Sequence, residues 1–235
     1  MSANPKKAAG ERAAELVDDG MIVGLGTGST AFYAIQKLGE RVREGLPIRG
    51  VPTSEQSRIQ AEREGIPLVD FAETIRIDLT IDGADEIDPA FNLIKGGGGA
   101  LFREKLVATA STREIIVADE SKLKERLGAF PLPVEVVPFG WQFVRLKLEA
   151  LGCRATLRVR ENRTFVTDNG NHVLDCAFGA IDDPEDLERR IGAICGVVES
   201  GLFVGLAHQI VIGKTDGTIE ERYRPQPPSA ATGVR

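Results

Sequence analysis

Short apolar runs alternate with stretches of helical periodicity along the first half of the chain. Residues 21–25 form an apolar run that predicts a strand, a glycine-rich turn follows, and apolar positions then recur at helical spacing as far as Val42. Ser54 is predicted to cap the start of a further helix. Additional strands are predicted over residues 48–51, 77–81 and 115–118. Strands that alternate with helices in this way predict a Rossmann-like α/β fold with a doubly wound, mostly parallel sheet.

The pattern changes after Phe130-Pro-Leu-Pro133, a proline-rich segment that is typical of a domain boundary. Beyond it, strands are predicted over residues 134–137, 154–159, 164–167, 172–176 and 197–200, and helices over 141–151 and 184–194. This order is close to a ferredoxin-like α+β layer. Asp168-Asn-Gly-Asn171 is interpreted as a structural hairpin turn between two of these strands, because Asn-Gly readily adopts positive φ.

A last strand over residues 206–212 is predicted to return to the first sheet. We therefore expect a Rossmann-like catalytic domain from residues 1–130 plus 203–222 and a small α+β domain from residues 131–202. Residues 223–235 contain three prolines and no apolar periodicity, which predicts a disordered tail.

Composition narrows the class of protein. Charged residues make up 27% and hydrophobic residues 42% of the 235 positions, as in ordinary globular proteins. The apolar runs fall short of the roughly 18 residues that a membrane span requires, and the N-terminus has no apolar signal region, so we expect a cytoplasmic protein without membrane contact. The odd number of cysteines (Cys153, Cys176 and Cys195) favours reduced thiols.

Charge and histidine spacing exclude two further classes. The formal net charge is −6 and no long Lys/Arg block occurs, which argues against a nucleic-acid partner. His172 and His208 are the only histidines, and neither stands at a zinc-ligand spacing, so no metal site is expected.

The first glycine turn, Gly24-Leu-Gly-Thr-Gly-Ser-Thr30, has features of a phosphate-binding loop. A dinucleotide motif would require glycine where Ser29 stands, and the Gly-Lys-Ser/Thr of a P-loop is missing. The remaining interpretation is a small anion cradle made of backbone N–H groups and hydroxyls at a helix N-terminus. A purely structural tight turn is the alternative.

A second window contains two carboxylates, a lysine and four glycines. Asp82-Gly-Ala-Asp-Glu86 closes an apolar run, and Lys95-Gly-Gly-Gly-Gly leads into Arg103-Glu-Lys105. Glycine-rich backbone can approach an anionic or sugar-like ligand closely, while the acids and the lysine supply proton chemistry. Because residues 27–30, 82–85 and 119–122 all follow predicted strands of one parallel sheet, we expect these segments to converge in space.

Six motifs in order resemble the type A ribose-5-phosphate isomerase family. They are Val23-Gly-Leu-Gly-Thr-Gly-Ser-Thr30, Asp82-Gly-Ala-Asp-Glu-Ile-Asp88, Lys95-Gly-Gly-Gly-Gly-Ala-Leu-Phe-Arg-Glu-Lys105, Asp119-Glu-Ser-Lys122, Phe130-Pro-Leu-Pro-Val-Glu-Val136 and Thr167-Asp-Asn-Gly-Asn171. The resemblance implies a Rossmann-like main domain with a smaller α+β domain, an isomerase without cofactor or metal, and a homodimer or homotetramer. The sequence departs from the family pattern only in the tail after Ile219.

The resemblance also implies roles for individual residues. Glu104 would be the base that moves a proton between C1 and C2 of the open-chain sugar phosphate. Substrate contacts would come from Thr27, Gly28, Ser29, Thr30, Asp82, Gly83, Ala84, Asp85, Lys95, Gly96, Gly97 and Gly98, with Lys122 near the phosphate and Lys6 as a further candidate there.

Elementary chemistry agrees with these assignments. Proton abstraction next to a carbonyl requires a carboxylate in reach and a cationic group at the developing enediolate oxygen, which fits Glu104 and Lys95. Asp82 and Asp85 would handle hydroxyl protons, including those moved on ring opening. The alternative for Glu104 is an ordinary surface acid in the charge run Arg103-Glu104-Lys105.

Three functions compete at this point. The first is an aldose–ketose isomerase that interconverts D-ribose 5-phosphate and D-ribulose 5-phosphate through a cis-enediolate. The second is a non-catalytic sugar-phosphate sensor, although the basic DNA-binding module of a regulator is missing from the sequence. The third, group transfer from coenzyme A on a similar scaffold, would require a larger chain. The isomerase is favoured, with the sugar phosphate as its small-molecule partner.

Overall fold

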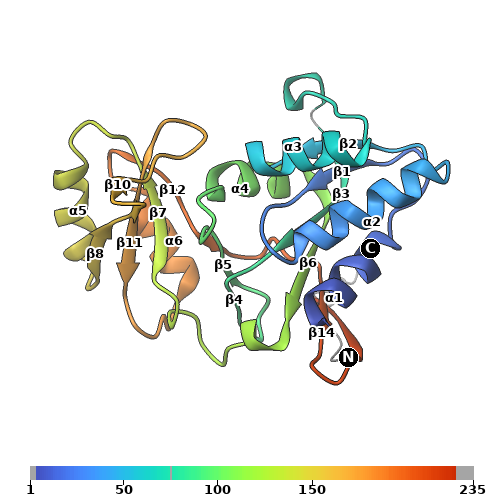
Figure 1. Cartoon of the computed structure of the whole chain (residues 1–235). Coiled ribbons are helices and arrows are strands. Elements are labelled where there is room, and N and C mark those ends of the chain that lie inside the picture. Colours follow the sequence, from blue (N-terminus) through green and yellow to red (C-terminus); the bar gives the residue numbers. More distant parts are fainter. Residues whose placement is uncertain (1–3, 75, 226–235) are drawn as a thin grey trace, which may run out of the picture.

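The computed structural model describes residues 4–74 and 76–225, which form two adjoining bodies (Figure 1). The larger body is built on a six-stranded sheet in the order β15-β14-β6-β3-β1-β2. Its strands are β1 (Ile22–Leu25), β2 (Arg49–Pro52), β3 (Ile77–Gly83), β6 (Ser111–Asp119), β14 (Gln209–Gly213) and β15 (Ile219–Tyr223). All neighbouring pairs are parallel except β14 with β15, so the sheet is mostly parallel, as predicted.

Helices cover both faces of this sheet. They are α1 (Pro5–Ala14), α2 (Ala31–Arg43), α3 (Glu55–Glu64) and α4 (Leu101–Thr109), with short 3₁₀ turns at Phe71–Glu73 and Glu120–Lys122. Alternate residues of β6 face opposite cores: Ile115 packs with α1 and α2, whereas Ile116 packs with Ala108 of α4 and with Phe203. This alternation follows from the two-residue period of a strand and confirms the doubly wound arrangement.

The smaller body has a four-stranded antiparallel sheet in the order β12-β7-β11-β8. In chain order its elements are β7 (Leu132–Val136), α5 (Trp141–Glu149), β8 (Arg154–Leu157), β11 (His172–Ala177), α6 (Pro184–Gly192) and β12 (Val197–Ser200). The β-α-β-β-α-β succession confirms the predicted ferredoxin-like layer. Val134, Leu174, Leu148 and Ile191 contribute to its own apolar core.

Short strands join the two bodies. β4 (Glu86–Ile87), β5 (Leu93–Ile94) and β13 (Leu202–Phe203) form a three-stranded sheet in the order β13-β5-β4. A hairpin of β9 (Val159–Arg160) and β10 (Arg163–Thr164) extends from the smaller sheet. Separate cores support the predicted domain limits of 1–130 plus 203–222 and 131–202, which stay a proposal.

Several local predictions were wrong. The strand expected over 164–167 ends at Thr164, because Phe165 turns its ring onto Gly99 and the Thr167 N–H donates to the carbonyl of Asn171 within the following turn. The turn at 168–171 exists, with Gly170 at φ +80°, but the strands that flank it pair with other partners and form no hairpin with each other.

The predicted tail is partly ordered. Tyr223 ends β15, which the sequence analysis missed, and the Arg224 N–H donates to the carbonyl of His208. The rest of that predicted tail, residues 226–235, lies outside the described part of the chain.

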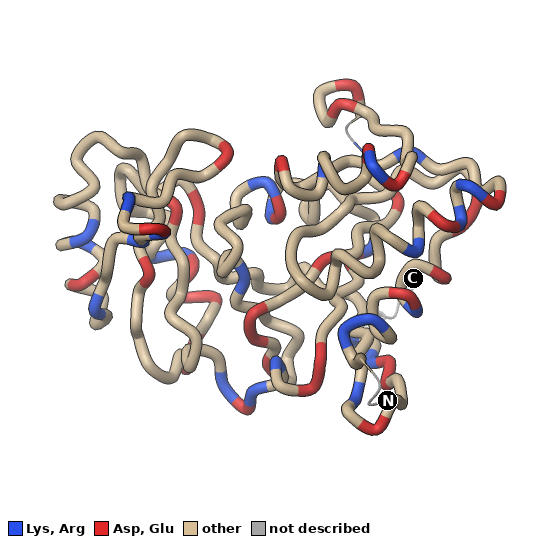
Figure 2. The backbone as a smooth tube through the Cα atoms, in the orientation of Figure 1, with Lys and Arg blue, Asp and Glu red and all other residues tan. Residues whose placement is uncertain are grey.

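In residues 4–74 and 76–225, no helix is both long and apolar enough to cross a membrane. The three cysteines are free, as expected, and acidic and basic residues are intermixed over both bodies (Figure 2).

Candidate active site

The predicted segments converge on one cavity of about 90 Å³ beyond the carboxyl ends of β1, β3 and β6. Its lining consists of Thr27, Gly28, Ser29, Thr30, Gly83, Ala84, Asp85, Lys95, Gly96, Gly97, Gly98, Glu104 and Lys122. Of the predicted site residues, only Asp82 and Lys6 are outside this lining. Asp82 lies fully buried beneath the cavity, and Lys6 reaches its rim, where its Nζ donates to Ser29 Oγ at 3.0 Å.

Asp82 organises the floor of the cavity. Its Oδ1 accepts hydrogen bonds from the backbone N–H groups of Thr27 at 3.0 Å and Gly83 at 2.7 Å, and so ties the turn after β1 to the end of β3. Gly26 permits this contact, because a Cβ there would stand 2.3 Å from Asp82 Oδ1. Gly28 at φ +116° then allows the turn to enter α2.

The start of α2 has the features of an anion site. Thr30 is the N-cap residue of this 13-residue helix, and its side chain makes no capping hydrogen bond. The N–H groups of Phe32 and Tyr33 donate to the carbonyls of Gly28 and Thr30, so the N–H groups of residues 28–31 are the ones left available to a ligand. The hydroxyl of Thr27, in the turn before this helix, lies 2.8 Å from Thr53 Oγ1 and 2.7 Å from Ser54 Oγ. Ser54 caps α3 in a capping box, as its sequence position predicts.

A buried charge cluster lies next to the anion site. Lys95 Nζ is 3.0 Å from Asp82 Oδ2 and 3.5 Å from Glu104 Oε2, donates to the carbonyl of Gly83, and lies 5.4 Å from the centre of the Phe203 ring. All three charged side chains are at most 5% exposed. Asp82 Oδ2 and Glu104 Oε2, the two oxygens that face Lys95, accept no regular hydrogen bond from the described residues. Glu104 lines the cavity and Asp82 does not, so the acceptor that a substrate hydroxyl can fill is that of Glu104.

Burial changes the proton affinities in this cluster. Loss of solvation raises the pKa of Glu104 to about 8, although the positive charge of Lys95 opposes the shift. Loss of solvation would lower the pKa of Lys95, but the facing carboxylates Asp82, Glu104 and Glu114 outweigh it and raise that pKa above its usual range. The cluster therefore pairs a permanent cation with a carboxyl group that can exchange its proton near neutral pH.

The alternative of an exposed charge run around Glu104 is wrong. α4 directs Glu104 into the site, while Lys105 bonds to Glu188 and Glu199 at 2.7 Å on the smaller body. Only Arg103 of this run is substantially exposed, with a third of its side chain in solvent.

Glu114 was missed by the sequence analysis. It is fully buried on β6, in register with Thr80, and therefore on the same face of the sheet as Asp82. Burial raises the pKa of Glu114 well above its ordinary value, and the charge of Asp82 adds to the effect. The strand was predicted to begin at residue 115, which placed this acid outside it; a charged residue directly before an apolar run was the available signal.

The smaller body supports the glycine-rich loop. Arg158 Nη1 donates to the carbonyl of Gly96 at 2.8 Å, and its Nε donates to Asp175 Oδ2 at 3.0 Å. On the other side of the loop, the Gly97 N–H donates to Asp85 Oδ2 at 2.7 Å. Arg158 was also missed, because no spacing in the sequence links it to a loop some 60 residues away.

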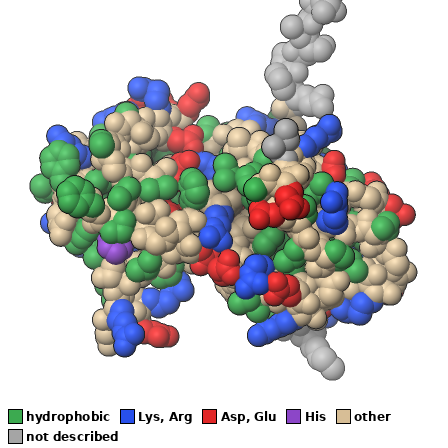
Figure 3. All heavy atoms as spheres, turned by 90° about the horizontal axis from the view of Figure 1, so that it is seen from above, with side chains coloured by type: hydrophobic (Ala, Val, Ile, Leu, Met, Phe, Trp, Pro, Cys, Tyr) green, Lys and Arg blue, Asp and Glu red, His purple; other side chains and the backbone are tan. Residues whose placement is uncertain are grey.

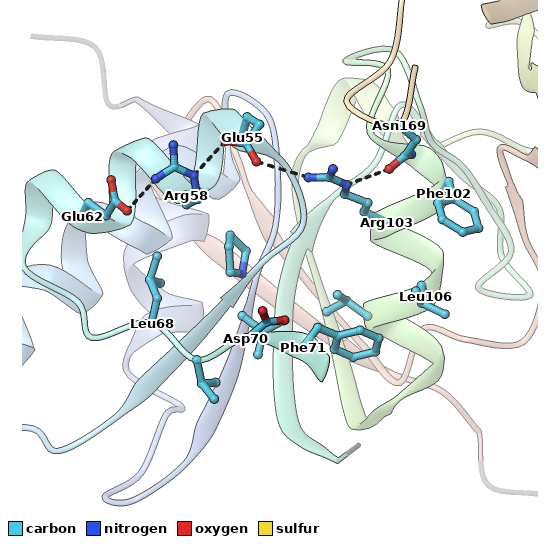
Figure 4. Close-up of a pocket in the computed structure, with 14 residues that line it drawn as sticks. Glu55, Arg58, Glu62, Leu68, Asp70, Phe71, Phe102, Arg103, Leu106 and Asn169 are labelled. Carbon is cyan, nitrogen blue, oxygen red and sulfur yellow. Dashed lines mark hydrogen bonds and ion pairs between the residues drawn. The ribbon is translucent and has the colours of Figure 1, made fainter. Parts of the chain in front are cut away.

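A larger cavity of about 580 Å³ lies between α3, α4 and residues 68–71 (Figure 4). Leu68, Phe71 and Leu106 contribute to its apolar walls, while Arg58 and Arg103 on its rim are already paired, both of them with Glu55. We assign the chemistry to the smaller cavity, because only that one has an acid and a cation with unused bonding capacity next to an anion cradle.

Among the described residues, no group of three or more His, Cys, Asp or Glu side chains is arranged to hold a metal ion. The fold and the cavity together define an α/β protein with a buried cluster of acids and a lysine beside a helix N-terminus. The family model for ribose 5-phosphate isomerase A (phosphoriboisomerase A) matches residues 49–217. The chain belongs to this family.

Individual relatives agree over nearly the whole chain. It is 56% identical to ribose-5-phosphate isomerase A of Gloeobacter violaceus over 214 residues, 90% of this chain and 93% of that one. It is 51% identical to ribose-5-phosphate isomerase A 1 of Oceanobacillus iheyensis, covering 90% and 95% of the two chains.

Solved structures show the same fold. The ribose 5-phosphate isomerase A of Methanocaldococcus jannaschii superposes with a TM-score of 0.88 at 40% identity, covering 93% of this chain and 97% of that one. A D-ribose-5-phosphate isomerase in complex with phospho-erythronic acid gives a TM-score of 0.90 at 39% identity with the same coverage. These structures bear out the predicted family and fold class.

Proposed function

We propose that this chain interconverts D-ribose 5-phosphate and D-ribulose 5-phosphate as an aldose–ketose isomerase. Membership of the family favours this function over the sensor alternative. The observation that carries the chemistry is the buried triad of Lys95, Asp82 and Glu104 at the carboxyl edge of the sheet. A general base benefits from burial that gives its carboxyl group a pKa of about 8, because it can then accept a proton near neutral pH. A sensor needs no such group.

The proposed reaction is a proton transfer between adjacent carbons. Ionised Glu104 takes the proton from C2 of the open-chain aldose, and the electron pair of that C–H bond forms the enediolate as the carbonyl oxygen at C1 becomes negative. Lys95 stabilises this oxygen. Glu104 then returns its proton to C1, while the proton of the C2 hydroxyl moves to the oxygen on C1, which leaves a ketone at C2.

Asp82 and Asp85 are proposed to move the hydroxyl protons, including the one transferred when the furanose ring opens. Asp82 Oδ2 faces Lys95 in the cluster, and Asp85 Oδ2 faces the N–H of Gly97 in the glycine-rich loop. No arginine of the described residues pairs with either carboxylate. Gly83, Ala84, Gly96, Gly97 and Gly98 would contact the sugar through backbone groups, since these residues line the cavity.

The phosphate is proposed to lie at the N-terminus of α2, held by N–H groups of residues 28–30 and by two lysines. Lys122 lines the cavity and Lys6 bonds to Ser29 at its rim. Phospho-erythronic acid, the compound in a solved relative, combines a carboxylate with a phosphate, which are the two charges this site would separate.

The predictions of a cytoplasmic location and of a homodimer or homotetramer rest on the sequence and the family resemblance. The absence of a cofactor is likewise a prediction, and the function test includes it.

The test is solvent-deuterium incorporation during turnover. The protein is dialysed against a chelator and incubated with ribose 5-phosphate in deuterated buffer without added cofactor. We expect ribulose 5-phosphate to form and deuterium to appear at C1 or C2. A protein that binds the sugar phosphate but shows neither product nor exchange would be the sensor.

A further inference from the structure

Helix α4 has a cavity on each side. Its Glu104 lines the smaller cavity, whereas Phe102 and Leu106, which are one helical turn apart, line the larger cavity of about 580 Å³. That volume is typical of a small-molecule site, which usually encloses roughly 300–1,000 Å³. The proposed isomerase reaction does not use the larger cavity, so its walls and its charges require a separate explanation.

The floor of the larger cavity is preformed by the core. Val51 of β2, Val69 and Val107 of α4 are at most 9% exposed and pack in one apolar cluster. The segment with Val69 runs beside β2, because the Val69 N–H donates to the carbonyl of Gly50 at 3.0 Å and the Gly50 N–H donates to that of Pro67 at 2.8 Å. A floor fixed by main-chain hydrogen bonds can receive a ligand without rearrangement.

The upper walls of the cavity are apolar and reach the solvent. Leu106 is 43% exposed, and the half-buried Phe71 and Phe102 line the same cavity. In the view from above, acidic side chains lie next to hydrophobic ones on the larger body (Figure 3). Apolar walls with a small number of polar groups favour ligands that have an apolar body.

The charges around the cavity leave one acid over. Three acidic and two basic side chains line it. Of the acids, Glu55 pairs with both Arg58 and Arg103, and Glu62 pairs with Arg58. The third acid, Asp70, has no ion pair within residues 4–74 and 76–225. The cavity therefore contains one negative charge that a ligand can neutralise.

Asp70 is placed to hold a cation. It lies next to Phe71, between α3 and α4 (Figure 4). Its Oδ1 accepts the Ala72 N–H at 2.9 Å at the start of a 3₁₀ turn, and its Oδ2 accepts no hydrogen bond from the described residues. An ammonium group could donate a charge-assisted hydrogen bond to Oδ2 while an attached ring packs on Phe71 and Leu106. An anionic ligand would instead have to break arginine pairs that are already formed.

We propose that the larger cavity binds small molecules that combine an apolar ring with one ammonium group. The ammonium group lies at Asp70 and the ring lies between Phe71 and Leu106. The ligand is opposite in charge to a sugar phosphate, and its site is on the other side of α4 from the Glu104 cavity. The inference does not depend on the proposed isomerase function, because it concerns binding alone.

Isothermal titration calorimetry of the full chain with three matched probes tests the site. The probes 4-phenylbutylamine, 4-phenylbutan-1-ol and 4-phenylbutyrate share one apolar body and differ in charge. The amine should bind saturably with a Kd below about 5 mM, the usual range for a compound of this size. The alcohol should bind about fivefold more weakly, and the carboxylate more weakly still. No saturable binding of the amine, or equally strong binding of the carboxylate, would overturn the proposal.

Substitutions on two walls locate the probe. Asp70→Asn should raise the Kd of the amine about fivefold, whereas Glu73→Gln, at an acid of the same 3₁₀ turn outside the cavity, should leave it unchanged. Leu106→Asn should weaken amine and alcohol alike by about fivefold. Ile59→Asn, at a residue 40% exposed on α3, is its matched control. All four positions are exposed, so the variants should fold, and unchanged amine binding by Asp70→Asn would contradict the assignment.

Competition separates the two cavities. Saturating ribose 5-phosphate should leave the Kd of the amine within about twofold, because the sugar phosphate would occupy the smaller cavity. Displacement of the amine would show that it binds to the acids of the smaller cavity and would overturn the proposal. Failure of the isomerase function would appear separately, as absence of turnover, and would leave binding of the amine intact.

Discussion

A carboxylate that takes a proton from carbon must bind that proton strongly and still be ionised part of the time. Glu104 meets both requirements because it is almost fully buried and yet lies 3.5 Å from the ammonium of Lys95. The first feature raises its proton affinity and the second limits the rise, which gives a pKa of about 8. The local environment thus converts an ordinary glutamate into a base suited to neutral pH.

Glu104→Gln keeps the size of the side chain and removes the proposed base. Turnover should fall by about 10²- to 10⁴-fold, the usual contribution of a positioned base, while KM for ribose 5-phosphate changes little. Steady-state kinetics check this, with Glu125→Gln at an exposed position as control. Near-normal turnover in the Glu104 variant would remove this residue from the mechanism.

The pH dependence follows from the same pKa. Since Glu104 must be ionised, kcat/KM should rise about tenfold per pH unit up to about pH 8 and then level off. Folding favours its neutral form, so its contribution to stability is complete below the ordinary pKa of 4.5 and is lost as the pH rises through 8. Glu104→Gln should therefore raise Tm more at pH 9 than at pH 5. A Tm difference independent of pH would show that the carboxyl group is solvated.

Lys122 permits a test of phosphate binding. Lys122→Ala should raise KM for ribose 5-phosphate about tenfold or more, because a lysine–phosphate contact is charge-assisted, while weak binding of unphosphorylated ribose should be unaffected. Lys124→Ala, two residues further on, is the control, since the Lys124 ammonium already bonds to the carbonyl of Ser121. Equal losses for the two sugars would contradict a phosphate role.

At the scale of elements, the sequence predicted what local rules determine. Apolar runs located β1, β2, β3 and β6, and Ser54 was found as a helix cap, because these features depend on residues within one or two turns. The convergence of residues 27–30, 82–85 and 119–122 followed from the parallel sheet alone. Contacts between distant segments could not be predicted from the sequence. The bond from Arg158 to Gly96 and the inward direction of Glu114 depend on tertiary packing. β15 was missed because its charged residues hide the strand pattern.

The glycine-rich loop depends on such a distant contact. Gly96 at φ +102° gives the loop little stiffness of its own, and Arg158 restrains it through the Gly96 carbonyl while Asp175 orients the guanidinium. Arg158→Met should lower kcat by about tenfold or more with a smaller change in KM, because Lys95 at the start of the loop loses its fixed position.

Arg160→Met is the matched control for this variant: Arg160 is exposed and, like Arg158, lies over the Phe165 ring, but the only partners described for it are on the smaller body. Arg158→Lys should recover only part of the loss, since a lysine cannot bond to Asp175 and a carbonyl in the same fork geometry. A fall in Tm with unchanged kcat would indicate a purely structural arginine.

At the scale of the molecule, the turn at residues 167–171 fastens the two bodies across the site. The Glu55 N–H at the start of α3 donates to Asp168 Oδ2 at 2.9 Å. Arg103 Nε of α4 donates to Asn169 Oδ1 at 2.9 Å (Figure 4). The first bond anchors the helix beside Thr27, and the second anchors the residue next to Glu104. Buried Glu135 holds the turn from within the smaller body.

Asp168→Ala should therefore loosen the site more than it destabilises the fold. A carboxylate at a helix N-terminus contributes about 1 kcal/mol, which for a chain of this size corresponds to roughly 2–4 °C in Tm. The bond also holds α3 and the turn of the smaller body in their places beside the site. Loss of its contribution of about 1 kcal/mol should therefore lower kcat about fivefold. Hydrogen exchange of residues 95–99 should become faster in this variant. Asp182→Ala, which breaks a surface ion pair with Arg126, is the control and should alter neither kcat nor hydrogen exchange. If Asp182→Ala changed kcat and exchange as much as Asp168→Ala does, the turn would have no special role in joining the two bodies.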